Sequence, residues 1–333
     1  MRIGLAGAGR IGAFHAATLC QLPGVDSVII TDADSARARA VARPLGAEAA
    51  ETAGGLLDSG LDALVIATAT DAHPEFIGRG VDAGLPVFCE KPVAPDIGGT
   101  LKVISRAAAS RAPVQVGFQR RFDAGFAAAR AAVRAGRLGW LHTLRATTLD
   151  PAPPPPEYVA TSGGLFRDCS VHDFDIIRWV TGREVTEVYA LGANRGAAFF
   201  RDAGDVDTMA AVLTLDDGTI ALVSGSRYNA AGYDVRLEVL GSAGSLCAGL
   251  DDRLPVTSAE PGATFPAGPP QASFLDRFAA AYRAELAAFI ALAAQGGPSP
   301  CTMADALEAF FVAEACELSR ARHAPVTLAE VRQ

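Results

Sequence analysis

Short apolar runs alternate with longer amphipathic stretches along the first third of the chain. The apolar runs are rich in β-branched residues and predict strands at residues 3–6, 27–31, 63–67, 87–89 and 114–117. The stretches between them are rich in alanine and predict helices at residues 11–21, 35–45, 74–83 and 97–109. Strands that alternate with helices in this way form a parallel sheet through crossover connections. Residues 1–119 are therefore expected to fold as a doubly wound α/β domain.

The pattern changes after Gln119. Helices are predicted at residues 124–135 and 274–294, and a capping-box pattern at Thr302 starts a further helix. Strands are predicted at residues 141–147, 185–194, 208–215, 220–227 and 234–240, with a hairpin turn at Asp216-Asp217-Gly218. The prolines within residues 151–156 exclude helix and central strand and predict a stiff loop. Residues 120–333 are expected to form an α+β domain with a large, mostly antiparallel, open sheet.

Composition narrows the classes of partner. The 333 residues are 50% hydrophobic, which suffices for a substantial core, and by length two domains are expected. The net charge is -8 at pH 7 and no run of Lys and Arg is long enough to follow a phosphate backbone, so nucleic acid is not expected. The chain passes from Met1 into a glycine loop without signal-peptide regions, and its apolar segments are too short to span a bilayer. We expect a cytoplasmic protein without a membrane segment.

The cysteines indicate neither a disulfide framework nor a metal site. The six cysteines lie far apart and form no C-x-x-C pair, whereas structural zinc sites usually have such pairs. Cys169 and His172 could be two metal ligands, but a catalytic zinc needs a third ligand from the protein and none follows. No bound metal is expected.

A glycine loop directly follows the first predicted strand. The segment Gly7-Ala8-Gly9-Arg10-Ile11-Gly12 fits G-x-G-x-x-G and opens a helix, the setting in which this motif binds a dinucleotide in Rossmann folds. Gly7 permits the tight turn, Gly9 lets a pyrophosphate approach the main chain, and Gly12 lets helix and strand pack closely. The N-terminus of the helix, at Arg10 and Ile11, faces the negative charge. The loop therefore predicts a dinucleotide site.

An acidic residue indicates which dinucleotide is bound. Asp32 ends the second predicted strand, about 20 residues beyond Gly12, where a carboxylate accepts hydrogen bonds from the ribose hydroxyls. The same carboxylate would repel a 2′-phosphate, so NAD is favoured over NADP, although Arg37 and Arg39 could weaken that preference. NAD is the expected cofactor.

Three polar residues further along the chain are suited to oxidising a hydroxyl. Lys91 follows a strand at the carboxyl edge of the predicted parallel sheet, where such folds bind ligands, and its ammonium would stabilise negative charge on a substrate oxygen. Asp168 and His172 are four residues apart and would share one face of a helix. His172 is the best general base, because the ordinary pKa of histidine is near 6.5.

These segments resemble the glucose-fructose oxidoreductase, inositol dehydrogenase and MocA family over nearly the whole chain. The resemblance is carried by the glycine loop, by Glu90-Lys91-Pro92, and by the segments 117–123 (GFQRRFD) and 168–175 (DCSVHDFD). Asp150-Pro151, Gly163-Gly164 and Gly232-Tyr233-Asp234 make the chain most similar to the inositol 2-dehydrogenases of that family. The resemblance implies a NAD-dependent dehydrogenase of a cyclic polyol, acting on myo-inositol and giving 2-keto-inositol.

The resemblance also implies roles for individual residues. Lys91, Asp168 and His172 would be catalytic, with His172 taking the hydroxyl proton, and the Lys91-Pro92 bond would be cis. Thr68, His73, Glu90 and Lys91 would join the glycine loop in binding the cofactor. The substrate contacts would come from Lys91, Gln119, Asp150, Asp168, His172, Asp175 and Tyr233. Arg120 and Arg121 are interpreted as structural ion-pair partners. Members of this family often form dimers and tetramers, so a homotetramer or a homodimer is expected.

Two residues depart from the inositol dehydrogenase pattern. Gln119 replaces a Met that is common there, and Cys169 replaces a Thr or Met. A Gln adds a hydrogen-bond donor and an acceptor to the pocket wall, which could favour another inositol isomer, a pyranose or an anhydrosugar. A second alternative is a non-catalytic sensor that binds a dinucleotide and a ligand. Retention of Lys91 together with Asp168 and His172 argues against the sensor.

Overall fold

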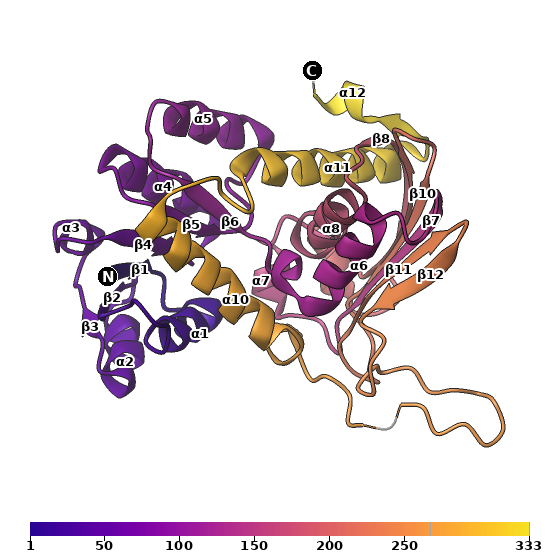
Figure 1. The fold of residues 1–333 in the computed structure, drawn as a ribbon, viewed down its shortest axis with the longest axis horizontal. Coiled ribbons are helices and arrows are strands. Elements are labelled where there is room, and N and C mark those ends of the chain that lie inside the picture. Colours follow the sequence, from indigo (N-terminus) through magenta and orange to yellow (C-terminus); the bar gives the residue numbers. More distant parts are fainter. Residues whose placement is uncertain (267, 333) are drawn as a thin grey trace. The chain divides into compact units, whose positions relative to one another are not determined.

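The computed structural model describes residues 1–266 and 268–332, which divide into two compact units (Figure 1). Unit 1 consists of Met1–Gln119 and Tyr282–Leu307, and unit 2 consists of Arg120–Ala281 and the residues from Glu308 onward. The helices α10 (Phe274–Gln295) and α11 (Met303–Arg322) each supply residues to both units. Each unit has its own sheet, and each is described by itself below.

Unit 1 is built on a six-stranded parallel sheet with the strand order β3-β2-β1-β4-β5-β6. Its strands are β1 (Arg2–Ala6), β2 (Ser27–Thr31), β3 (Glu48–Ala49), β4 (Ala63–Ile66), β5 (Val87–Glu90) and β6 (Val114–Gly117). Its crossover helices are α1 (Arg10–Leu19), α2 (Ser35–Leu45), α3 (Ala53–Leu57), α4 (His73–Asp82) and α5 (Ile97–Ala108), with a short 3-10 helix η1 (Thr70–Ala72) before α4. The strand order reverses between β1 and β4, where ligands bind in folds of this kind. The predicted α/β fold of this part is confirmed.

Local sequence explains how these helices begin and end. The Asp34 side chain caps α2 by accepting hydrogen bonds from Ala36 N and Arg37 N, and Gly46 ends the helix in the left-handed conformation. The central strands are buried on both faces, and the residues Leu286, Phe289 and Ile290 of α10 join their core cluster. β3 was not predicted because both of its residues are exposed and form no apolar run.

Unit 2 is built on a seven-stranded sheet with the strand order β12-β11-β7-β10-β9-β8-β13. Its strands are β7 (Leu141–Leu149), β8 (Val185–Ala193), β9 (Thr208–Leu215), β10 (Ile220–Ser226), β11 (Asp234–Gly241), β12 (Gly244–Ala248) and β13 (Val326–Thr327). Among the described strands of this sheet, β7 and β10 form the one parallel pair, and the other pairs are antiparallel. The predicted mostly antiparallel sheet is confirmed, with β12 and β13 as additions.

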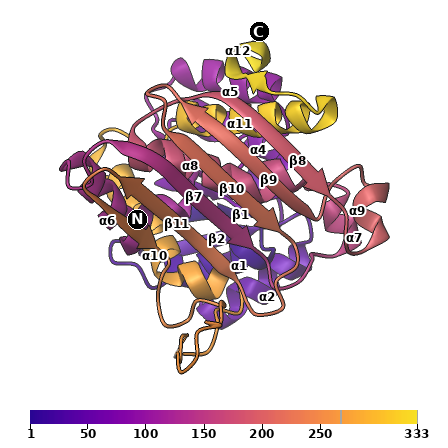
Figure 2. The ribbon, with the colours of Figure 1, turned by 90° about the vertical axis from the view of Figure 1, so that its right-hand side faces the viewer.

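The two faces of this sheet differ in their cover. Buried side chains such as Leu144, Leu213 and Val223 line one face, toward the helices α6 (Ala124–Arg134) and α8 (Val171–Thr181) of the same unit. Figure 2 looks onto the strands from the other side, where no helix of the described part of unit 2 lies over them. This open face carries exposed apolar side chains: Tyr189, Leu191, Val212, Ile220 and Leu222.

Two short helices of unit 2 differ from what the sequence predicted, which was a loop at the proline run and a regular helix at Asp168. The proline run is a loop as far as Pro155, but Pro156 starts the one-turn helix α7 (Pro156–Val159), since proline is tolerated at the first helical position. Residues Phe166–Ser170 form a π-helix, η3, that runs directly into α8. The other short helices are η2 (Gln119–Phe122), α9 (Ala198–Asp202) and α12 (Leu328–Val331). No helix of the described chain is long and apolar enough to cross a membrane.

Candidate active site

The glycine loop of unit 1 has the geometry that the motif predicts. Gly7 has φ +100, and a Cβ there would lie 2.3 Å from Ala67 O, so no other residue fits without distortion. A Cβ on Gly12 would lie 2.1 Å from Gly7 O, which explains the close packing of α1 on the loop. A Cβ on Gly9 would meet nothing within 4 Å. Gly9 therefore faces open space, into which a bound group can approach the main chain.

The amide groups and the carboxylate around this loop suit a dinucleotide. No side chain caps α1 at Gly9, and its first turn carries no acidic residue that would repel an anion at this helix N-terminus. Asp32 Oδ2 accepts a hydrogen bond of 2.6 Å from Ala8 N, and Asp32 Oδ1 accepts one of 2.9 Å from Asp34 N. Arg37 Nη1 lies 3.5 Å from the same carboxylate. Asp32 is thus fixed at the end of β2, next to the loop.

His73 joins the loops that follow β4 and β5. Its Nδ1 lies 2.7 Å from Pro92 O and its Nε2 lies 3.2 Å from Thr68 O. Burial lowers the pKa of His73, so its ring is neutral and donates one hydrogen bond. The side chain is 1% exposed and offers little surface to a cofactor. His73 therefore joins the two loops, and its predicted contact with the cofactor stays a prediction.

The segment Glu90-Lys91-Pro92 ends β5 at the carboxyl edge of the sheet. The Lys91-Pro92 peptide bond is cis, as the family resemblance implied. Glu90 Oε1 lies 2.7 Å from His15 Nε2, and the His15 side chain is fully buried between Phe88 and Tyr282. The sequence analysis did not select His15 as a site residue. A histidine on the buried side of α1 could have indicated one, because histidine is unusual in a protein core.

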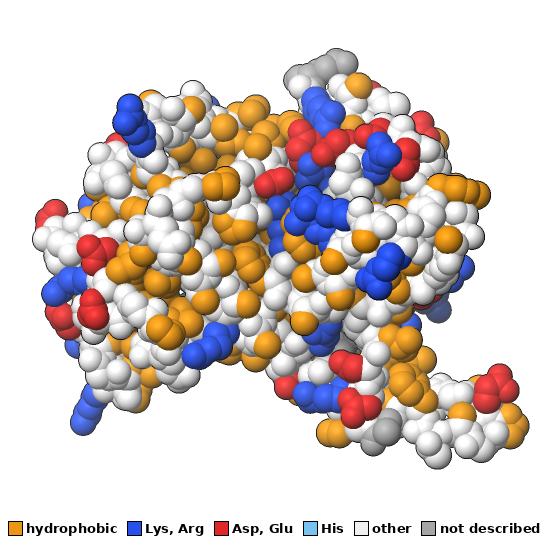
Figure 3. All heavy atoms as spheres, in the orientation of Figure 1, with side chains coloured by type: hydrophobic (Ala, Val, Ile, Leu, Met, Phe, Trp, Pro, Cys, Tyr) orange, Lys and Arg blue, Asp and Glu red, His pale blue; other side chains and the backbone are white. Residues whose placement is uncertain are grey.

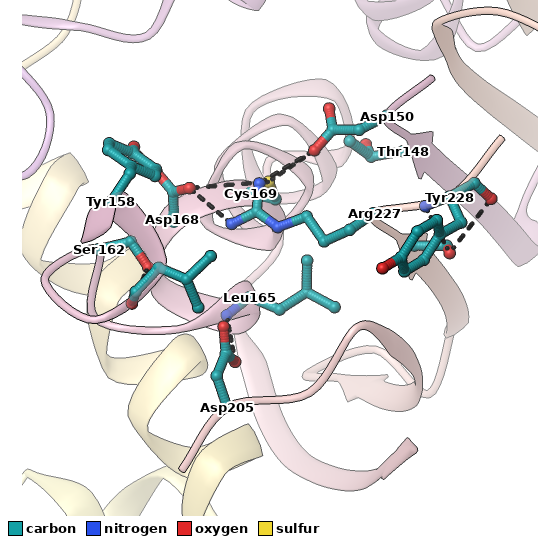
Figure 4. Close-up of polar contacts among 12 residues, drawn as sticks. Thr148, Asp150, Tyr158, Ser162, Leu165, Asp168, Cys169, Asp205, Arg227 and Tyr228 are labelled. Carbon is teal, nitrogen blue, oxygen red and sulfur yellow. Dashed lines mark hydrogen bonds and ion pairs between the residues drawn. The ribbon is translucent and has the colours of Figure 1, made fainter. Parts of the chain in front are cut away.

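A cluster of polar side chains forms the candidate site of unit 2, and Figure 4 shows it. Asp150 follows β7, Asp168 and Cys169 lie in η3, and Arg227 follows β10. Arg227 Nη1 donates to Asp150 Oδ2 at 2.9 Å, and Arg227 Nη2 donates to Asp168 Oδ2 at 2.7 Å. Arg227 Nη1 also contacts Cys169 Sγ. One guanidinium therefore joins the two carboxylates.

The charges of this cluster are interdependent. Burial raises the pKa of Asp150, and the guanidinium of Arg227 opposes that rise. Burial alone would lower the pKa of Arg227, but Cys169 and the two carboxylates raise it, so Arg227 remains charged. Tyr158 adds a hydrogen bond of 2.9 Å from its hydroxyl to Asp168 Oδ1. Asp168 is therefore held through both of its oxygens.

Unit 2 also contains two ion pairs that are buried. Arg120 Nη1 donates to Asp173 Oδ1 at 2.5 Å, and Arg121 binds both oxygens of Asp175 at 2.9 and 2.5 Å. The interpretation of Arg120 and Arg121 as structural partners agrees with these contacts. Asp175 is fully buried and pairs with Arg121, and its predicted contact with the substrate stays a prediction.

The other expected site residues lie in different surroundings. Tyr233 is 6% exposed, its ring packs edge-on against Phe278, and burial raises its pKa. Gln119 is 3% exposed and lies at the end of unit 1, the same unit as Lys91. Asp168 and His172 lie in unit 2, and the π-helical turn places Asp168 directly before the α-helix that carries His172.

The residues that the structure describes offer neither a metal site nor a basic surface on the face drawn in Figure 3. Within that range, no group of three or more His, Cys, Asp and Glu side chains could hold a metal ion, and no disulfide joins any of the six cysteines. On the face drawn in Figure 3, Lys and Arg side chains are interspersed with Asp and Glu. No continuous basic stripe is visible on that face.

Comparison with protein families gives a match to each part of the chain. Residues 1–118 match the model described as "Oxidoreductase family, NAD-binding Rossmann fold". Residues 126–247 match the model of the GFO/IDH/MocA C-terminal domain. The two matches agree with the glycine loop and Asp32 in unit 1 and with the mixed sheet of unit 2.

Individual proteins resemble the chain over nearly its whole length. A myo-inositol dehydrogenase of Streptomyces leeuwenhoekii is 42% identical over 96% of this chain and 97% of its own. The crystal structure of a myo-inositol dehydrogenase from Corynebacterium glutamicum matches with a TM-score of 0.91 and 35% identity, over 98% of both chains. A scyllo-inositol dehydrogenase from Lactobacillus casei, solved with bound NAD(H) and scyllo-inositol, matches with a TM-score of 0.87 and 31% identity, over 99% of both chains.

Proposed function

Because the chain belongs to the GFO/IDH/MocA family of NAD-dependent oxidoreductases, we propose that it oxidises a secondary hydroxyl of a cyclic polyol, with myo-inositol as the substrate and 2-keto-inositol as the product. The observation that best supports this proposal is the Asp150–Arg227–Asp168 cluster of unit 2. It presents paired carboxylates, which accept hydrogen bonds from neighbouring hydroxyls. The relatives named for myo- and scyllo-inositol support the same class of substrate.

The cofactor would be held by unit 1. Gly9 and the N-terminal amides of α1, at Arg10 and Ile11, would hold the pyrophosphate, and Gly7 and Gly12 shape the turn. Asp32 would accept hydrogen bonds from the ribose hydroxyls and would repel a 2′-phosphate. Thr68, Glu90 and Lys91 lie in the loop after β4 and at the end of β5, where they would line the nicotinamide side. When bound, NAD supplies a nicotinamide that takes up a hydride.

Three residues would carry the chemical step. His172 would accept the proton of the hydroxyl, so that the oxygen gains negative charge as hydride leaves the same carbon. The ammonium of Lys91 would stabilise that charge. Asp168, fixed by Arg227 and Tyr158, would hold the substrate hydroxyls together with Asp150. Gln119, Tyr233 and Cys169 would shape the pocket, and a hydroxyl pattern other than that of myo-inositol remains the alternative.

The substrate prediction is tested with purified protein. We expect reduction of NAD with myo-inositol, and at least about tenfold lower kcat/KM with NADP, because Asp32 opposes the 2′-phosphate. The measurement is absorbance of the reduced cofactor with a panel of inositol isomers, pyranoses and anhydrosugars. If a pyranose is oxidised and none of the inositols is, the proposed substrate is wrong but the reaction class stands. Turnover of no member of the panel would contradict the reaction class itself.

We also propose that two copies of the chain associate through the open face of the unit 2 sheet, giving a dimer or a tetramer. The exposed side chains of Tyr189, Leu191, Val212 and Leu222 support this, since contiguous exposed apolar surface is rare on monomers.

Leu222 is 40% exposed at the middle of β10, and Leu222→Asp places a charge there. Sedimentation should show a smaller species for Leu222→Asp than for the unaltered chain. The exposed residue Leu250, outside this face, gives the control Leu250→Asp. An unaltered chain that sediments as a monomer would refute the association.

A further inference from the structure

Arg227 follows β10 at a buried position, where an apolar residue is usual. Along β10, Ala221, Val223 and Gly225 are buried and alternate with more exposed residues, and Arg227 continues the buried phase. Its side chain is 4% exposed. A buried guanidinium without a structural or functional reason is costly to fold. The reason lies in the acidic residues that it contacts.

Asp150 and Asp168 approach the same guanidinium from different elements. Asp150 leaves the end of β7, and Asp168 lies in the π-helix η3 (Figure 4). Their side chains are 20% and 10% exposed, so water screens the two negative charges poorly. Two carboxylates in such a place cannot both remain ionised unless a cation lies between them. Arg227 supplies that cation and bonds to Oδ2 of each.

We propose that Arg227 is a positioning residue of the active site, which keeps Asp150 and Asp168 ionised at a fixed separation so that each receives a different hydroxyl of the polyol. This inference rests on the proposed function. Arg227 acts through the two carboxylates and is not itself a catalytic group. Its planar, forked guanidinium suits the task, because it directs one N–H group toward each carboxylate.

Removal of Arg227 therefore has a defined electrostatic consequence. The charged and titratable groups that face Asp150 are Arg227, Asp168, Cys169 and Tyr233. Without the guanidinium, the opposing influence on Asp150 is lost, while burial and the charge of Asp168 still raise its pKa. Asp150 would then take up a proton at a higher pH. Activity that needs the ionised form would fall away at a higher pH than in the unaltered protein.

The test compares Arg227→Gln with Arg178→Gln. Arg178 is also buried, with 8% of its side chain exposed, and it binds both oxygens of Glu184 outside the Asp150 cluster, so it controls for the loss of a buried arginine and its ion pair. We expect kcat/KM for the polyol to fall about 100-fold in Arg227→Gln, as it does when a substrate is misaligned in other enzymes. The acidic limb of its pH profile should move to higher pH. Binding of NADH, followed by its fluorescence, should remain unchanged. Arg178→Gln should keep the pH profile of the unaltered protein.

Two further measurements test the inference if no polyol is oxidised or if Arg227→Gln does not fold. Carbon-13 NMR of labelled aspartate carboxyls follows the titration of Asp150 without any turnover, so it applies even if no polyol is oxidised and the proposed function fails. Arg227→Lys keeps the charge but replaces the fork by a single ammonium. We expect this variant to fold, to keep the acidic limb near its original pH and to lose kcat/KM through a raised KM.

Three results would overturn the inference. The first is that the Asp150 carboxyl titrates at the same pH in the unaltered protein and in a folded Arg227→Gln variant. The second concerns Arg227→Lys and decides the matter if Arg227→Gln does not fold. If Arg227→Lys oxidises the polyol with unaltered kcat and KM, the forked geometry of the guanidinium has no role. The third is an equal fall of kcat/KM in Arg227→Gln and Arg178→Gln with identical pH profiles, which would reduce Arg227 to a structural residue.

Discussion

Lys91→Ala should reduce kcat for polyol oxidation by about 100-fold to 1,000-fold, the usual effect of removing one group that stabilises charge in a transition state. The physical reason is that Lys91, at the carboxyl end of β5, would provide the positive charge for the oxygen as hydride leaves its carbon. Affinity for NADH should change little, since Lys91 would only line the nicotinamide side, while the glycine loop after β1 and Asp32 after β2, on the far side of β4 from β5, would hold the pyrophosphate and the ribose. Steady-state kinetics and NADH fluorescence titration measure the two quantities.

The chain contains a natural control for this experiment, because Lys91 and Lys102 are its only lysines. Lys102 lies exposed on α5, so Lys102→Ala should leave kcat, KM and NADH affinity unchanged. Turnover that survives Lys91→Ala at the original rate would remove Lys91 from the mechanism. It would also favour the alternative of a non-catalytic sensor, which binds the dinucleotide and a ligand but catalyses no reaction.

His172→Gln should lower kcat/KM by about 100-fold to 10,000-fold, the range for loss of a general acid or base. A neutral imidazole accepts the hydroxyl proton and a protonated one cannot, so activity of the unaltered enzyme should fall at the pH where His172 becomes protonated. Gln has a similar size but does not titrate. The residual activity of His172→Gln should therefore lack the acidic limb that His172 causes.

The pH profile of kcat/KM is the measurement that separates a base from a structural histidine. His142 is exposed on β7 and serves as the matched control, so His142→Gln should retain both the rate and the limb. An unchanged acidic limb in His172→Gln would assign the limb to another group. The Asp150 carboxyl would be the first to examine, because its pKa is raised by burial.

Much of the fold could be predicted because its signals are local. Apolar runs marked β1, β2, β4, β5 and β6, and the capping pattern at Thr302 correctly placed the start of α11, where Thr302 and Asp305 exchange hydrogen bonds. The strands β3, β12 and β13 were missed, since two of them are two-residue strands whose pairing depends on a neighbour. Short strands of this kind have little periodicity of their own.

The site was harder to predict than the fold because its contacts are not local. The glycine loop and Asp32 have fixed spacing, so their sequence was sufficient for a prediction. Arg227 and Asp150 are 77 residues apart, and their contact depends on a strand pairing that no spacing rule specifies. The burial of Asp175 and His73, which are 0% and 1% exposed, could not be predicted from the sequence because it depends on residues far away along the chain.

The parallel pairing of β7 with β10 has a consequence for how the substrate range can change. Asp150 and Arg227 meet because parallel strands finish at the same edge, as shown by Asp150 N donating to Ser226 O. An antiparallel pairing would have put the two side chains about 20 Å apart, the length of a seven-residue strand. Residues just beyond a strand end can be replaced without disturbing the pairing that precedes them. Divergent copies of this gene could therefore acquire new polyol preferences through changes at positions 150 and 227 while inheriting an unaltered sheet.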